Sequence, residues 1–107
     1  MENFEKEAKR AAHKHAMLSI VSPFTHKEPV KDTEESFLVG VYAIRENINK
    51  TVETKKRGLT VDEVLEQAFA KHVAECYNGA ENNKDLMLCV RNDIFCGIEW
   101  YLLKSED

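Results

Sequence analysis

The amino-acid sequence predicts an all-α protein: a small four-helix, mostly antiparallel domain with a long central αα-hairpin. Through most of the chain, apolar residues recur at steps of three and four, which is the spacing of one face of an α-helix. Both prolines fall in one short segment, and capping signals separate the later helices. A chain of 107 residues can bury one core but not two. We therefore expect residues 1–107 to form a single helical domain.

The first helix is expected over residues 4–21. Proline disfavours helical geometry in the residue before it, so Pro23 ends this helix, and residues 22–32, which hold both prolines, form a loop. The apolar face of this helix is expected to consist of Phe4, Ala8, Ala11, His15 and Leu18.

The second and third helices are expected over residues 33–57 and 61–77. Asp32 with Glu35 and Thr60 with Glu63 both have capping-box spacing, so each pair predicts a helix start. A helix of 33–57 would be about 37 Å long and would need a partner along its length, which makes helices two and three the central hairpin. The buried side of helix two is expected to hold Phe37, Val41, Ile44, Ile48 and Val52. The buried side of helix three is expected to hold Val61, Val64, Leu65, Ala68, Phe69, His72 and Cys76.

The fourth segment, residues 84–103, could form a helix or a strand hairpin that turns at Asn92 and Asp93. A helical projection gathers its apolar residues on one face, whereas a strand gives no comparable alternation, so a helix is favoured. That face holds Leu86, Val90, Ile94, Gly97, Ile98 and Tyr101. No internal repeat is evident in the sequence.

Two glycines lie inside expected helices, Gly40 in helix two and Gly97 in helix four. Glycine within a helix costs about 1 kcal/mol relative to alanine. Its presence therefore predicts that helices two and four cross with their backbones close together. The crossing could lie within one chain or between the two chains of a homodimer.

Charge and composition exclude several classes of function. The formal charge of −4 provides no long-range attraction for nucleic acid, and no apolar run is long enough to span a membrane. The Gly58-containing junction resembles the turn of a helix-turn-helix, but Asp62 and Glu63 would then face the DNA phosphates. Three cysteines do not form a complete disulfide framework and fit a reducing compartment. We expect a cytoplasmic protein with a protein partner.

Histidine and cysteine provide the sharpest chemical pattern. His72 and Cys76 lie one helical turn apart, and Cys89 and Cys96 lie on the next helix. Zinc sites use four such ligands, but this spacing lacks the short clips of known zinc patterns. Buried cysteine commonly packs as a small hydrophobic residue. We therefore expect no metal ion and no cofactor.

Asp93 is the one carboxylate expected on a buried face, and it needs a partner there. Arg45, at the edge of the buried face of helix two, is the predicted partner. A lone acid without a nucleophile, base or metal is a weak basis for catalysis. Together these residues define an alternative function, a small-ligand or metal pocket between helices, formed by Arg45, His72, Cys76, Asp93 and Trp100.

The sequence contains no catalytic motif, so an enzyme is disfavoured. The E-x-x-E spacing of Glu63 and Glu66 resembles magnesium-binding helices, but no second acidic helix accompanies it. A small interaction module is the favoured function, such as an inhibitor or adaptor of the kind that phages and mobile elements encode. Its binding surface is expected on the acidic side of helix three, at Asp62, Glu63 and Glu66.

Overall fold

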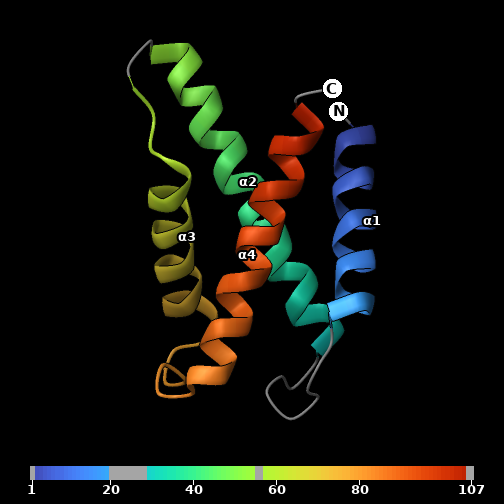
Figure 1. The fold of residues 1–107 in the computed structure, drawn as a ribbon, viewed down its shortest axis with the longest axis vertical. Helices are drawn as coiled ribbons and strands as arrows, with labels where there is room; N and C mark the ends of the chain where they lie inside the picture. The colour runs from blue at the N-terminus through green and yellow to red at the C-terminus, as the bar shows by residue number, and fades with distance from the viewer. Residues whose placement is uncertain (1, 20–28, 55–56, 106–107) are drawn as a thin grey trace.

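The computed structural model describes residues 2–19, 29–54 and 57–105. The described chain forms four α-helices: α1 (Glu2–Ser19), α2 (Pro29–Thr54), α3 (Val61–Cys76) and α4 (Lys84–Ser105). Successive helices run in opposite directions, and α2 crosses α4 between the outer helices α1 and α3 (Figure 1). The predicted all-α, mostly antiparallel fold is confirmed. Although α3 follows α2 as an antiparallel neighbour, α2 packs most extensively against α4.

Some helix ends differ from the prediction. Helix α2 begins at Pro29 and not at residue 33, so Asp32 lies in its first turn and is not its N-cap. Proline suits a first turn because its missing N–H would have no helical partner there. The last predicted residues of helix one, most of the predicted loop and residues 55–56 lie outside the described residues. The fourth segment is a helix from Lys84 to Ser105, so the strand-hairpin alternative is wrong.

The crossing of α2 and α4 depends on the two helical glycines. A Cβ atom on Gly40 would lie 1.9 Å from the carbonyl oxygen of Ile94, and one on Gly97 would lie 1.9 Å from that of Phe37. Both positions therefore admit no side chain. The predicted close approach is confirmed, and it forms within one chain. Since both glycines are buried in this crossing, a homodimer would have to use other surfaces.

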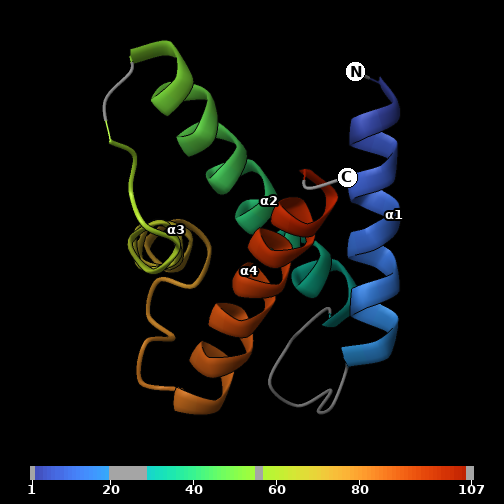
Figure 2. The ribbon, with the colours of Figure 1, turned by 45° about the horizontal axis from the view of Figure 1, so that its top comes forward.

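The glycine contacts are reciprocal and reveal an approximate two-fold axis. The same Cβ on Gly40 would lie 3.1 Å from the backbone nitrogen of Ile98, and the one on Gly97 would lie 3.1 Å from that of Val41. Each glycine thus meets the residue three before and the residue one after the other. The axis relates the α1–α2 hairpin to the α3–α4 hairpin and runs vertically in Figure 1, with α1 and α3 on opposite sides of the crossing in Figure 2.

Burial follows the same relation, because residues 57 positions apart in the chain occupy equivalent places. The buried residues Thr33, Ser36, Phe37, Gly40 and Val41 correspond in order to the buried residues Val90, Asp93, Ile94, Gly97 and Ile98. Few equivalent positions are identical; His15 with His72 and Gly40 with Gly97 are among them. No repeat is evident in the sequence because the two halves have few identical residues at equivalent positions. The two halves share a pattern of buried and exposed positions, and many different side chains can produce the same pattern.

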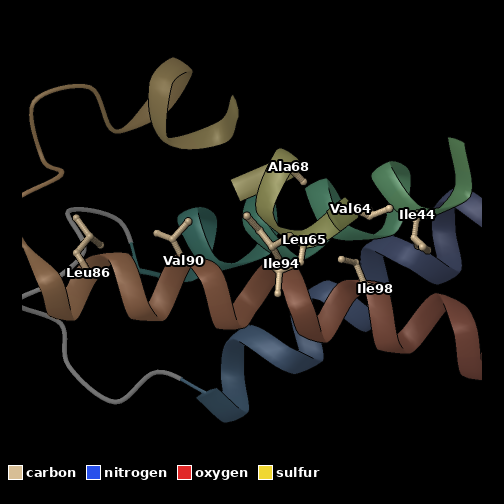
Figure 3. Close-up of a cluster of buried hydrophobic side chains, with 8 residues drawn as sticks. All are labelled: Ile44, Val64, Leu65, Ala68, Leu86, Val90, Ile94 and Ile98. Atoms are coloured by element: carbon tan, nitrogen blue, oxygen red, sulfur yellow. The ribbon is translucent and has the colours of Figure 1, made fainter. Parts of the chain in front are cut away.

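Two groups of buried side chains hold the helices together. The larger joins α4 to α2 and α3, and Figure 3 shows its α4 members in a row. It consists of Ile44, Val64, Leu65, Ala68, Leu86, Val90, Ile94 and Ile98. The smaller joins α1 to α2 and contains Ala8, Ala12, Phe37 and Val41. Small alanine side chains let α1 lie close against α2.

Three residues placed on buried faces by the sequence are exposed. Leu18 is 77% exposed and Val52 is 72% exposed, so the apolar faces of α1 and α2 end before them. The buried face of α1 is centred on Ala8, Ala12 and Ala16, turned away from Leu18. Cys76, in the last turn of α3, is exposed as well.

Candidate functional site

The five residues of the predicted inter-helix pocket separate into two groups on opposite sides of α2. Arg45, Asp93 and Trp100 take part in contacts between α1, α2 and α4, whereas His72 and Cys76 belong to α3. The predicted single pocket does not assemble. Each group is best described with its own neighbours.

On the α1 side, the buried Asp93 accepts a hydrogen bond from His15, with 2.9 Å between His15 Nε2 and Asp93 Oδ1. The imidazole also packs against the ring of Phe37, with the ring centroids 5.2 Å apart. Arg45 instead lies over the ring of Phe4, 4.3 Å from its centroid. The predicted Arg45–Asp93 pair is therefore wrong. A guanidinium can stack on an aromatic face near the surface, whereas the deeper carboxylate is reached by the imidazole of α1.

The equivalent histidine on the α3 side meets a hydroxyl group. His72 Nε2 lies 3.3 Å from Ser36 Oγ, and both residues are buried. Ser36 is the two-fold counterpart of Asp93, just as His72 is the counterpart of His15. Each histidine thus crosses from its own hairpin to the central helix of the other hairpin. The sequence placed both histidines on buried faces but could not pair them.

The surroundings of His72 keep it uncharged. Burial lowers the pKa of its imidazole, and Glu35, Glu75 and Asp32 raise that pKa by a smaller amount. The neighbouring Tyr77, whose ring centroid is 5.4 Å from that of His72, has its pKa raised to about 12 by burial and by Asp32. At neutral pH both rings are therefore neutral, and the interior between α2 and α3 holds a polar but uncharged cluster.

None of the three thiols belongs to a cluster of metal-ligating side chains in the described part of the chain. Burial, assisted by nearby carboxylates, raises the pKa of Cys76, Cys89 and Cys96, so all three are protonated at neutral pH. Among the described residues, no group of three or more His, Cys, Asp or Glu side chains could hold a metal ion.

A groove of about 400 Å³ runs between α2 and α3. Both helices contribute residues at helical spacing, and small side chains at Ala43 and Ala68 leave the space between them unfilled. Asn47 closes one end, because its side chain hydrogen-bonds to both the N–H and the C=O of Leu59. The lining consists of Val39, Tyr42, Ala43, Glu46, Asn47, Lys50, Leu59, Val64, Gln67, Ala68, Lys71, His72 and Glu75.

A second groove, of about 370 Å³, lies between α3 and α4 and is lined by Asp62, Leu65, Leu88, Arg91, Asn92 and Phe95. Leu88 is 65% exposed at this groove. The sequence analysis missed Leu88 and Phe95. A signal was available for Leu88, an apolar residue near Arg91 and Asn92 on the polar side of the helical projection.

The three carboxylates of the predicted acidic surface have different surroundings. Glu63 caps α3: its side chain accepts a hydrogen bond from the N–H of Thr60 at 2.9 Å, completing the predicted capping box. Glu66 accepts from Arg91 Nε at 3.0 Å. Asp62 lies on the rim of the α3–α4 groove. Two of the three negative charges are therefore already engaged within the chain, and the surface is mixed in charge.

Comparisons with models of protein families, with curated proteins and with solved structures find no match to this chain. No helix of the described residues is long and apolar enough to cross a membrane.

Proposed function

We propose that this protein is a small interaction module, an inhibitor or adaptor that binds a protein partner in the cytoplasm through the α3–α4 groove. On this proposal the chain is not an enzyme, and a phage or mobile element is the kind of genome that would encode it. Protein-binding surfaces commonly place an apolar anchor at the centre of a polar rim. Here Leu88 with Phe95 is the anchor, and Asp62, Arg91 and Asn92 form the rim.

The exposed Leu88 is the observation that carries the proposal. Its two-fold counterpart in the first hairpin is Lys31, which is also exposed. One half of the molecule therefore presents a charged side chain where the other half presents an apolar one beside a groove. Other apolar side chains, such as Leu103, are equally exposed, but Leu88 lies beside a groove, and a partner that filled this groove would remove Leu88 from water.

Site-specific photocrosslinking in cells that express the protein tests this function. A photoreactive residue replaces either Leu88 or Leu103, which lies on the same helix and is 66% exposed. We expect one defined protein adduct from position 88 and not from position 103. Equal adducts from both positions, or adducts from neither, would contradict the proposal.

The identified partner then allows a matched comparison of affinities. Leu88→Lys should weaken binding by more than tenfold, because it places a charge at the apolar anchor, whereas Leu103→Lys should leave binding unchanged. Asp62→Lys should have a smaller effect that disappears at high salt, as expected for a rim charge. Equal losses for the two leucine variants would remove the α3–α4 groove as the binding surface.

A further inference from the structure

The two halves of the molecule differ most clearly at one pair of equivalent positions. Trp100 on α4 corresponds to Ala43 on α2, 57 positions earlier. The indole of Trp100 lies 6.1 Å from the ring of Phe4 and 6.2 Å from the ring of Phe37, between centroids. It therefore occupies the space where α1, α2 and α4 meet. At the corresponding position on the other side, Ala43 has only a methyl group, and it lines the α2–α3 groove.

Two charged residues beside Trp100 have counterparts that line the groove. The ammonium group of Lys104 lies 5.7 Å from the indole centroid and pairs with Glu7 of α1. The counterparts of Lys104 and Glu7 are Asn47 and Val64, and both line the α2–α3 groove. Three positions, those of Trp100, Lys104 and Glu7, thus hold an indole and its neighbours on one side, and their counterparts Ala43, Asn47 and Val64 line an open groove on the other.

We propose that the α2–α3 groove binds a small molecule with a planar aromatic ring. The ring would lie over Ala43, at the position where the other side of the molecule has the indole of Trp100. The volume of about 400 Å³ falls in the range of small-molecule sites. Val39, Val64 and Ala68 supply apolar contacts. The charged lining residues are two acids, Glu46 and Glu75, and two bases, Lys50 and Lys71, so the ring and not the charge of a substituent defines the ligand class.

The groove has one buried polar group to orient such a ligand. This group is His72, which lines the groove and has its Nε2 within hydrogen-bonding distance of Ser36 Oγ. In the other half, His15 is bonded to a carboxylate and packed against Phe37. A neutral imidazole at the wall of this groove can donate or accept one hydrogen bond, which suits an aromatic compound with a single polar substituent. This site is separate from the α3–α4 groove of the proposed function.

Titration of the wild-type protein with indole, followed by amide chemical shifts, tests the proposal directly. We expect saturable shifts confined to groove residues, including Ala43, Val64 and Ala68. Absence of such shifts up to the solubility of indole would overturn the proposal. Shifts at the groove that depend on protein concentration without indole would also overturn it, because a second copy of the chain would then be the occupant.

Two blocking variants and one opening variant serve as controls. Ala43→Trp should fill the groove from within and weaken indole binding by at least tenfold, and the smaller Ala43→Leu should do the same if the tryptophan variant does not fold. Trp100→Ala should open the equivalent space and add a second indole site near Phe4. Undiminished indole binding by a folded Ala43 variant would overturn the proposal, whatever the result at the α3–α4 groove.

Discussion

The His15–Asp93 and His72–Ser36 contacts occupy equivalent places, yet their surroundings differ. His15 bonds to a carboxylate beside a space filled by Trp100, whereas His72 bonds to a hydroxyl beside an open groove. On the α1 side of the molecule, the indole of Trp100 fills the interior. On the α3 side, the equivalent position is Ala43, and the space beside it is an open groove. Because of the approximate two-fold axis, each position can be compared with its equivalent in the other half. The comparison shows where one half has a large side chain and the other has a small one.

The largest expected effect comes from disrupting the crossing of α2 and α4, to which both halves contribute one glycine. Gly40→Ala and Gly97→Ala should each destabilise the fold by more than about 3 kcal/mol, because the new methyl group would overlap a backbone carbonyl of the facing helix. Since the two environments are equivalent, the two losses should agree within about 1 kcal/mol, the spread that local packing differences produce. Urea denaturation measures both. A loss at one glycine without a loss at the other would contradict the two-fold relation.

The two histidine contacts should differ in strength. Asp93→Ala removes a buried hydrogen bond to a carboxylate and should cost about 2 kcal/mol, whereas Ser36→Ala removes a longer bond to a hydroxyl and should cost about 1 kcal/mol or less. Urea denaturation of both variants at pH 7 makes the comparison. An equal or larger cost for Ser36→Ala would show that the two halves do not differ in this way.

The smallest effect concerns pH. The pKa of His72 is lowered in the folded protein, so between neutral pH and this lowered value the unfolded chain binds a proton that the folded chain does not. Stability should therefore fall as the pH drops below about 6.5, the ordinary histidine value. His72→Gln should flatten this decline between pH 7.5 and 5.5, with the free energy of unfolding measured at each pH. The matched variant His15→Gln should retain the decline. If the decline disappeared in His15→Gln and persisted in His72→Gln, the assignment to His72 would be wrong.

The sequence predicted the helices and their crossing because these depend on local signals. Thr60 with Glu63 defined the start of α3, and the helical cost of Gly40 and Gly97 pointed to a close backbone contact. The partner of Asp93 was not predictable in this way. Arg45 and His15 both lie on helices near it, and the choice between them depends on the depth at which each helix packs. That depth is set by the alanine face of α1, which only the assembled structure reveals.

The candidate sites were less predictable than the fold. A groove arises where side chains fail to fill a space, and Ala43 has no feature in the sequence that separates it from any other helical alanine. The acidic residues Glu63 and Glu66 were visible, but their engagement by Thr60 and Arg91 was not. The two-fold relation escaped detection because it preserves burial and spacing and leaves most side chains different.

The reciprocal glycine crossing also bears on how the chain folds. Each hairpin presents one face of its second helix to the other hairpin, so neither hairpin alone can bury that face. The connection through residues 57–60 then acts as a covalent tether, which holds the two halves at an effective concentration on the order of millimolar. Two separate fragments, each one hairpin, should accordingly recombine when mixed at such concentrations and stay unstructured when dilute. Folding of this chain would then resemble the association of two separate molecules, the α1–α2 hairpin and the α3–α4 hairpin, which are joined covalently.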